Sequence, residues 1–201
     1  MAIKFHYNKT SLQHLNKQLK IRINALPTLK NKEAALRIEV KKAKDEAARL
    51  DSLLDEKITA SDNTLRLWNE FKPDLVSIKD VRLSVKKIAG VKTPILEGIE
   101  FEIKDFSLFK NPTWYPEGIS VIRELAHIAL ERDVFERKTE LLDFARKKTT
   151  QKVNLYEKVQ IPGYEEAILK IKRFMEDEEN LSKSAQKIVK SRMEQKESEA
   201  A

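Results

Sequence analysis

Cysteine is absent from the sequence and glycine is rare. With no cysteine among 201 residues, the chain has neither a disulfide framework nor thiolate chemistry. Its four glycines form no glycine-rich turn ending in Gly-Lys-Ser or Gly-Lys-Thr, the motif that cradles a phosphate. His6, His14 and His127 are too scattered to ligate a metal. We therefore expect no catalytic residues, no metal and no cofactor, in a protein that is not itself an enzyme.

Long hydrophobic runs are also missing. No window approaches the roughly 18 apolar residues of a membrane span, and residues 1–7 lack the apolar core of a signal peptide. We expect a cytoplasmic protein without direct membrane insertion. The net charge of +7 comes with lysines and arginines spread among acidic residues and with no nucleic-acid-binding motif, so we expect solvated faces and no nucleic-acid partner.

What is abundant is charge and helix-forming residues. Charged residues make up 35% and hydrophobic residues 41% of the chain, a composition typical of long exposed helices and coiled coils. Through the first 70 residues, two apolar series recur at intervals of seven. They include Leu12, Leu19, Leu26, Val40 and Leu54 in one, and Leu15, Leu29, Leu36, Ala43 and Leu50 in the other. These are the a and d positions of a coiled-coil seam, interrupted by Arg22, Glu33 and Lys57.

The pattern changes in residues 73–116, which contain four of the six prolines. Here Val81, Leu83 and Val85 alternate with polar residues, as do Ile99, Phe101 and Ile103, and a period of two indicates half-buried strands. A helical apolar stripe then returns. The predicted fold is mainly α, a long antiparallel two-helix coiled-coil hairpin with a short β-hairpin or β-rich lobe inserted between the helices. Its predicted parts are long helices over 8–72 and 117–182, an insert over 73–116, and a basic overhanging tail over 183–201.

Two prolines fall inside the helical patterns. Proline costs about 3 kcal/mol in a helix interior and bends or breaks it. Counted inward to the lobe, Pro27 and Pro162 lie equally far from it, so in an antiparallel hairpin we expect both at one level, within about two turns of each other. A shared bend or local loosening is predicted there. The same register places Lys32 beside Glu157.

Two short blocks carry a resemblance to a known family. The first contains Leu29, Lys30, Lys32 and Leu36. The second contains Val153 and Asn154, then Ile161 and Pro162, followed by Ile168 and Ile171. Together they resemble the D subunit of the V-type and archaeal-type rotary ATPases, which has Leu-Leu-Lys-x-Lys-Arg in its first helix and Arg-Val-Asn-Ala-Leu-Glu leading to Ile-Pro in its last. The chain departs from that pattern at Thr28, Glu33 and Tyr156, and the resemblance is weak across the middle lobe.

The resemblance implies the central rotor shaft of a V/A-type ATP synthase or ATPase. Such a shaft transmits torque between ATP hydrolysis or synthesis in a catalytic hexamer and H⁺ or Na⁺ translocation by the membrane ring. The implied partners are the hexamer subunits, a small companion subunit of the central stalk and a funnel-shaped adaptor on the ring, at the cytoplasmic face of the membrane. The ten residues of the two blocks are expected to contact partners or to form the seam.

Two other classes of protein fit the same helical pattern. A prefoldin-like chaperone also joins paired helices through β-hairpins, although its arms are usually shorter, and it would assemble with itself. A generic coiled-coil tether would need no partner at the lobe and would dimerise through its seam. The Val-Asn block followed by Ile-Pro favours the shaft.

Overall fold

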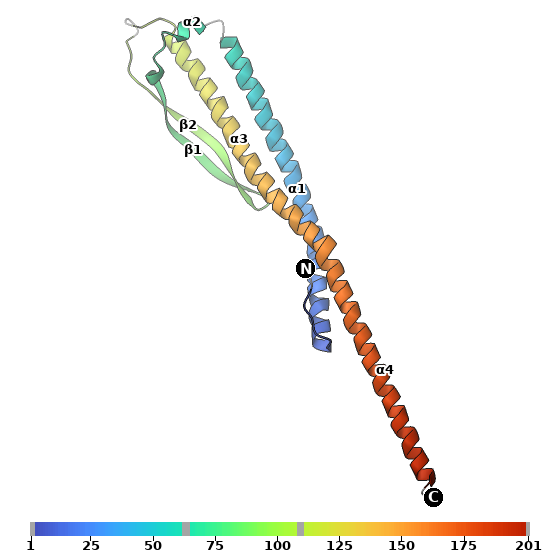
Figure 1. Ribbon diagram of the computed structural model, residues 1–201. Coiled ribbons are helices and arrows are strands. Elements are labelled where there is room, and N and C mark those ends of the chain that lie inside the picture. Colours follow the sequence, from blue (N-terminus) through green and yellow to red (C-terminus); the bar gives the residue numbers. More distant parts are fainter. Residues whose placement is uncertain (1–2, 62–64, 108–110, 200–201) are drawn as a thin grey trace. The chain divides into compact units, whose positions relative to one another are not determined.

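The computed structural model describes residues 3–61, 65–107 and 111–199. The protein is mainly helical with one two-stranded antiparallel sheet, which confirms the predicted fold class (Figure 1). The elements are α1 (Lys9–Ser61), α2 (Leu65–Trp68), a 3₁₀ turn (Pro73–Leu75), β1 (Val76–Ile88), β2 (Val91–Ile103), α3 (Tyr115–Leu155), a π-helical segment (Tyr156–Gln160) and α4 (Ile161–Glu199). Within the described residues, no helix is both long and apolar enough to span a membrane.

The chain divides into two compact units. Residues 1–31 and 150–201 form one, here called the terminal unit, and residues 32–149 form the other, the central unit. The first helix was predicted to reach residue 72, whereas α1 ends at Ser61 and the short α2 follows. The predicted division into a helical pair, an insert and a tail stays a prediction.

The terminal unit is built on an antiparallel pair of helices. Its core contains Leu15 of α1 and Ala167, Ile168 and Ile171 of α4, which sit at the spacings of three and four that a helix seam requires. The N-terminal segment packs against this core through Ile3 and Phe5. The α1 helix starts after Asn8, whose side-chain oxygen accepts the Ser11 backbone N–H at 2.7 Å as an N-cap.

The α4 helix continues well past the residues that α1 packs against. Met175 is half-buried, but every side chain from Glu176 to Gln195 is exposed. Large apolar side chains are among them: Leu181, Ile188, Val189 and Met193, which are 55–72% exposed. Val189 and Met193 follow Ile171 and Met175 at helical spacing, so the seam side of the helix continues here without a packed partner among the described residues.

The central unit repeats the antiparallel pairing with the C-terminal part of α1 and with α3. Leu36, Val40 and Ala43 pack against Leu142, and both Leu36 and Leu142 are fully buried. Ion pairs lie at successive levels, Asp51 with Arg132 and Lys57 with Glu124. Residue numbers rise along α1 as they fall along α3, so the two helices run in opposite directions.

The β-hairpin belongs to the central unit and runs beside α3 (Figure 1). Its strands join through Ala89 and Gly90, whose φ angles of 49° and 81° are both positive, as a type I′ hairpin turn requires. The flanking pair Ile88 and Val91 packs against the core around Leu36. The two predicted strands are thereby confirmed, with the end of the hairpin anchored on the helices. The predicted alternation of half-buried side chains is wrong for Leu83 and Val85, which are exposed, since a register shift between Arg82 and Leu83 changes which side chains of β1 lie on each face.

Aromatic side chains close the other end of the hairpin. Trp68, Phe71, Phe106, Trp114 and Tyr115 form a cluster with ring centroids 5.2–6.1 Å apart. The Tyr115 hydroxyl donates a hydrogen bond to the Glu70 carbonyl oxygen. This second core of the central unit includes Phe71, the last apolar residue of the predicted coiled-coil pattern.

Candidate interaction surfaces

The ten residues singled out in the sequence divide by burial. Leu36, Val153, Ile168 and Ile171 are buried, and Leu29 and Ile161 are half-buried, so these six contribute first to packing. The other four are exposed: Lys30, Lys32, Asn154 and Pro162. Lys32 and Leu36 belong to the central unit, and the other eight belong to the terminal unit.

Within the terminal unit, one contact joins the two sequence blocks directly. Lys30 Nζ donates to Glu157 Oε1 at 2.8 Å, between side chains that are each about half exposed. The sequence register places Lys32 opposite Glu157, but the structure gives that position to Lys30. An exposed pair of this kind stabilises the fold by less than about 1 kcal/mol. It therefore shows which residues of the two helices lie opposite each other, but it contributes little to the stability of that arrangement.

Arg22 is one of the three residues that interrupt the heptad pattern. It occupies a d position of the seam, where an apolar side chain is the rule. Its Nε donates to Gln160 Oε1 at 2.6 Å, and its Nη1 donates to the side-chain and backbone oxygens of Gln18. The guanidinium lies 4.6 Å from the ring centroid of Tyr164 and 5.9 Å from that of Tyr156. Arg22 thus replaces apolar packing by hydrogen bonds and cation–π contacts.

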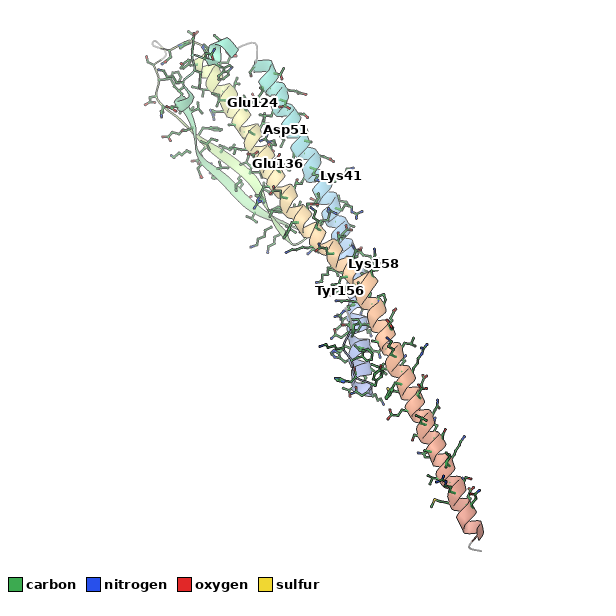
Figure 2. All side chains as sticks on the ribbon, viewed as in Figure 1. Lys41, Asp51, Glu124, Glu136, Tyr156 and Lys158 are labelled. Carbon is green, nitrogen blue, oxygen red and sulfur yellow. The ribbon has the colours of Figure 1, made fainter. Side chains whose placement is uncertain are left out.

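The helix is wider at this level because of Pro162. The Ile161 backbone N–H donates to the Tyr156 carbonyl oxygen, five residues back, which is the π-helical pattern. In a regular α-helix, Pro162 would lack an N–H and its ring would clash with the carbonyl of residue 158. A wide turn just before the proline relieves that clash. Figure 2 labels Tyr156 and Lys158 in this segment.

The predicted level of the two prolines is confirmed. Pro27 lies on α1 between Arg22 and Lys30, and the partners of those two residues, Gln160 and Glu157, both belong to the π-helical segment. Pro162 follows that segment directly, so the two prolines lie within about two turns of each other. The loosening is found in the second helix, and a bend shared by both helices stays a prediction.

Replacing Arg22 by lysine is expected to lower the free energy of unfolding by about 1 kcal/mol. Lysine keeps the positive charge but lacks the planar guanidinium group, which donates hydrogen bonds to both Gln160 and Gln18 and stacks on Tyr164. Urea unfolding followed by circular dichroism measures the effect. The matched change Arg37→Lys, at an exposed residue paired with Glu33, is expected to have almost none. Equal stability of Arg22→Lys and the parent would show that the guanidinium contacts of Arg22 do not stabilise the fold.

Charge on the helices of the central unit is largely arranged in ion pairs. Figure 2 labels Lys41 and Asp51 on α1, and Glu124 and Glu136 on α3. On α3, hydrogen bonds from Lys147 and from Arg146 lower the pKa of the Asp143 carboxyl below its ordinary value. Such pairs four or three residues apart support a helix by a few tenths of a kcal/mol each. They give the described helices of the central unit a hydrophilic surface.

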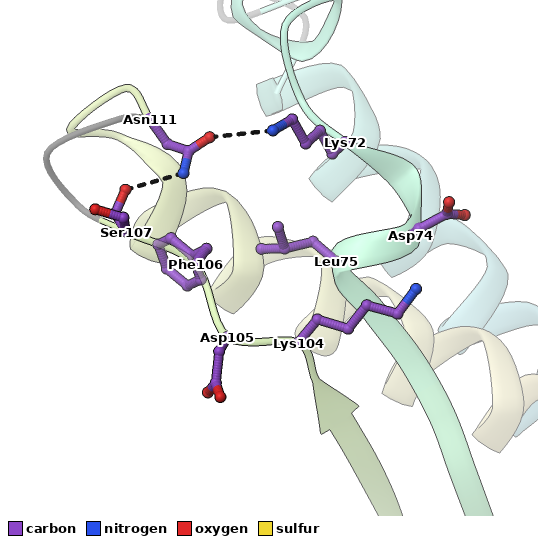
Figure 3. Close-up of a pocket in the computed structure, with 8 residues that line it drawn as sticks. All are labelled: Lys72, Asp74, Leu75, Lys104, Asp105, Phe106, Ser107 and Asn111. Carbon is purple, nitrogen blue, oxygen red and sulfur yellow. Dashed lines mark hydrogen bonds between the residues drawn. The ribbon is translucent and has the colours of Figure 1, made fainter.

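An open pocket lies at the base of the hairpin (Figure 3). Lys72, Asp74, Lys104 and Asp105 line it around Leu75 and Phe106. Lys72 Nζ lies 3.5 Å from Asn111 Oδ1, and Asn111 Nδ2 donates to the Ser107 carbonyl oxygen. Because two lysines and two aspartates share the rim, the pocket favours neither an anion nor a cation.

Comparison with known proteins gives one consistent family. A family model that describes the D subunit of ATP synthase matches residues 11–191. The V-type ATP synthase D subunit of Borreliella burgdorferi is 30% identical over 191 residues, which cover 94% of each chain. The proteins of the same name from Chlamydia muridarum and Chlamydia pneumoniae are 26% and 28% identical and cover at least 95% of both chains. The match therefore runs through the middle lobe, where the resemblance in the sequence was weak.

Proposed function

The chain belongs to the ATP synthase D-subunit family, and from this premise we propose that it is the non-catalytic shaft of a V/A-type rotary ATPase. In this role it transmits torque between ATP hydrolysis or synthesis in the catalytic hexamer and H⁺ or Na⁺ translocation by the membrane ring. The observation that carries the proposal is the family match along nearly the whole chain, because neither a chaperone nor a tether would share it.

The architecture of each unit supports this role. Paired antiparallel helices with a common apolar seam resist bending better than a single helix does. The central unit adds ion pairs between its helices, Asp51 with Arg132 and Lys57 with Glu124. A rotating part must carry torque along its axis, and helix pairs packed at several levels provide the stiffness for it.

We assign the exposed length of α4 to the hexamer. From Glu176 to Gln195 the helix has no packed neighbour within the described residues, yet it presents Leu181, Ile188, Val189 and Met193. Exposed apolar side chains on a helix that packs against no other element favour binding inside a surrounding protein surface. The basic residues interspersed among them, such as Lys187 and Arg192, suit a polar or acidic lining.

The other partners follow from the same proposal. The small companion subunit of the central stalk and the funnel-shaped adaptor on the membrane ring bind at the lobe, and the protein is held at the cytoplasmic face of the membrane through the complex. Nucleic acid and direct membrane insertion have no part in it. Of the motif residues, exposed Lys30, Lys32, Asn154 and Pro162 are assigned to partner contacts, and the buried ones to the seam.

Removal of residues 176–201 tests the proposed function. Each chain is expressed in cells that lack the native copy, and ATP-driven ion uptake is measured in membrane vesicles from those cells. The full chain is expected to restore uptake. The truncated chain is expected to restore roughly a tenth of it or less, because the hexamer then no longer contacts the C-terminal part of the shaft. Affinity purification of both chains reports assembly. Full ion uptake with the truncated chain would show that the part of α4 from Glu176 onward is not needed to transmit torque. Failure of the full chain to recover catalytic subunits would refute the proposal itself.

A further inference from the structure

The charge of the protein is concentrated at its N-terminal end. The first 32 residues contain seven basic residues, Lys4, Lys9, Lys17, Lys20, Arg22, Lys30 and Lys32, and no aspartate or glutamate, since the first acidic residue is Glu33. The whole chain has a formal net charge of +7, so residues 33–201 are neutral overall. The interleaving of charges expected along both helices therefore does not hold for this segment.

Within α1 these lysines share one side of the helix. Lys9, Gln13, Asn16, Lys17, Lys20 and Asn24 follow one another at intervals of one, three and four residues, which places them on a stripe about 100° wide. All six side chains are exposed. The stripe faces away from the seam residues Leu12, Leu15 and Leu19, which belong to the core of the terminal unit. We call it the lysine–amide face.

The lysines of this face have no counter-charge in the described part of the protein. Lys9, Lys17 and Lys20 make no ion pair with any described residue, whereas three other lysines of the terminal unit do. Lys30 pairs with Glu157, Lys170 with Glu166 and Lys183 with Glu179. Arg22 is used inside the seam. Three lysines on one helix face repel one another, and an outside partner with negative charge would relieve that repulsion.

We propose that the lysine–amide face docks against a carboxylate-bearing protein surface. Carboxylates accept hydrogen bonds from lysine ammonium groups and from the amide N–H groups of Gln13, Asn16 and Asn24. Lysine acts as a flexible point charge, which attracts without fixing one geometry, as a surface that moves past its partner requires. The face has no arginine and no aromatic side chain, unlike typical nucleic-acid-binding surfaces, and it lacks the apolar stripe of a membrane-bound helix.

This inference rests on the proposed function, in which the acidic surface belongs to the rotary ATPase and faces this part of the shaft. It goes further by naming the chemistry of that surface and the side of α1 that meets it. Electrostatic complementarity of this kind acts mainly on the rate of association and weakens as salt is added. Both properties are measurable.

The test compares two triple charge reversals. Lys9→Glu/Lys17→Glu/Lys20→Glu inverts the face, and Lys41→Glu/Lys42→Glu/Lys44→Glu makes the same change in net charge at exposed lysines of the central unit. Each chain is added to ATPase complexes that lack their own copy, and the association rate is followed at low and high salt. The first variant is expected to associate at least about tenfold more slowly at low salt, with the difference shrinking as salt rises, and the control less than about twofold more slowly. Equal slowing of both would overturn the proposal.

A second measurement separates the proposal from the proposed function. The isolated chain is expected to bind poly-glutamate, and the first triple variant is expected to lose that binding by at least about tenfold while the control keeps it. Retained poly-glutamate binding by a chain that does not join the ATPase would refute the proposed function alone. Stronger face-dependent binding to phosphatidylserine vesicles or to duplex DNA than to poly-glutamate would refute the assignment to a protein surface. Circular dichroism establishes that both variants are folded, as expected for exposed positions.

Discussion

Replacing Leu36 by alanine is expected to lower the free energy of unfolding of the central unit by about 3 kcal/mol. Leu36 is fully buried and packs with Val40, Ala43 and Leu142 in the core that joins α1 to α3. The substitution removes buried methyl groups and leaves a cavity that rigid helix backbones cannot fill. Thermal and urea unfolding, followed by circular dichroism at the helix band, measure the loss.

Leu181→Ala provides the matched control. It is the same chemical change in a helix, but Leu181 is 72% exposed, so almost no effect on unfolding is expected. Leu142→Ala should resemble Leu36→Ala, and the double variant should cost less than the sum of the two because both changes open the same cavity. An effect of Leu36→Ala below about 1 kcal/mol would contradict the packing described for this core.

Substituting Gly118 by valine is expected to cost about 2–3 kcal/mol and to disturb the aromatic cluster. A Cβ atom at this position would lie 2.6 Å from a ring atom of Trp114 and 3.3 Å from one of Phe71. Rings held on several sides by their neighbours cannot move away cheaply. The gain in helix propensity over glycine, less than about 1 kcal/mol, does not offset the clash.

Tryptophan fluorescence reports this change directly, because Trp68 and Trp114 are the two tryptophans of the chain and both belong to the cluster. We expect a red-shifted emission and a lower midpoint of thermal unfolding. Gly98→Ala is the control: the nearest side chain to an added Cβ is Arg82, at 4.0 Å. A valine variant with unchanged emission and stability would show that the cluster has more room than the structure indicates.

Much of the architecture could be predicted from local sequence. The heptad series placed Leu15, Leu36, Val40, Ala43 and Leu50 on one side of the first helix, and all five are buried. Alternation in the middle of the chain predicted the two strands. Both predictions succeeded because a repeat of 3.5 or of two residues is a property of a single segment and needs no knowledge of its partner.

The features that local sequence did not predict depend on which residues meet across the helix pair. In the heptad pattern Arg22 only interrupts the seam, and its role depends on Gln160, Tyr156 and Tyr164 around it. The predicted partner of Glu157 was two residues away from the actual one, Lys30, because the count started from a first helix that reaches residue 72, whereas α1 ends at Ser61 and α3 begins at Tyr115. A periodic pattern does not show at which residue a helix ends, so the starting point of the count became known only from the structure.

The sequence by itself determined the helical class, the hairpin, the level of the two prolines and the family, all of which follow from local periodicity or from short residue blocks. Tertiary structure decided where α1 ends, which apolar residues are left exposed on α4, and which lysines keep a counter-charge. The physical reason is the same in each case. Burial and charge compensation belong to pairs of residues far apart in the chain, so they become visible only when both members of a pair have been placed. The seven basic residues of the first 32 could be counted from the sequence, but only the fold separated Arg22 and Lys30, which have partners, from Lys9, Lys17 and Lys20.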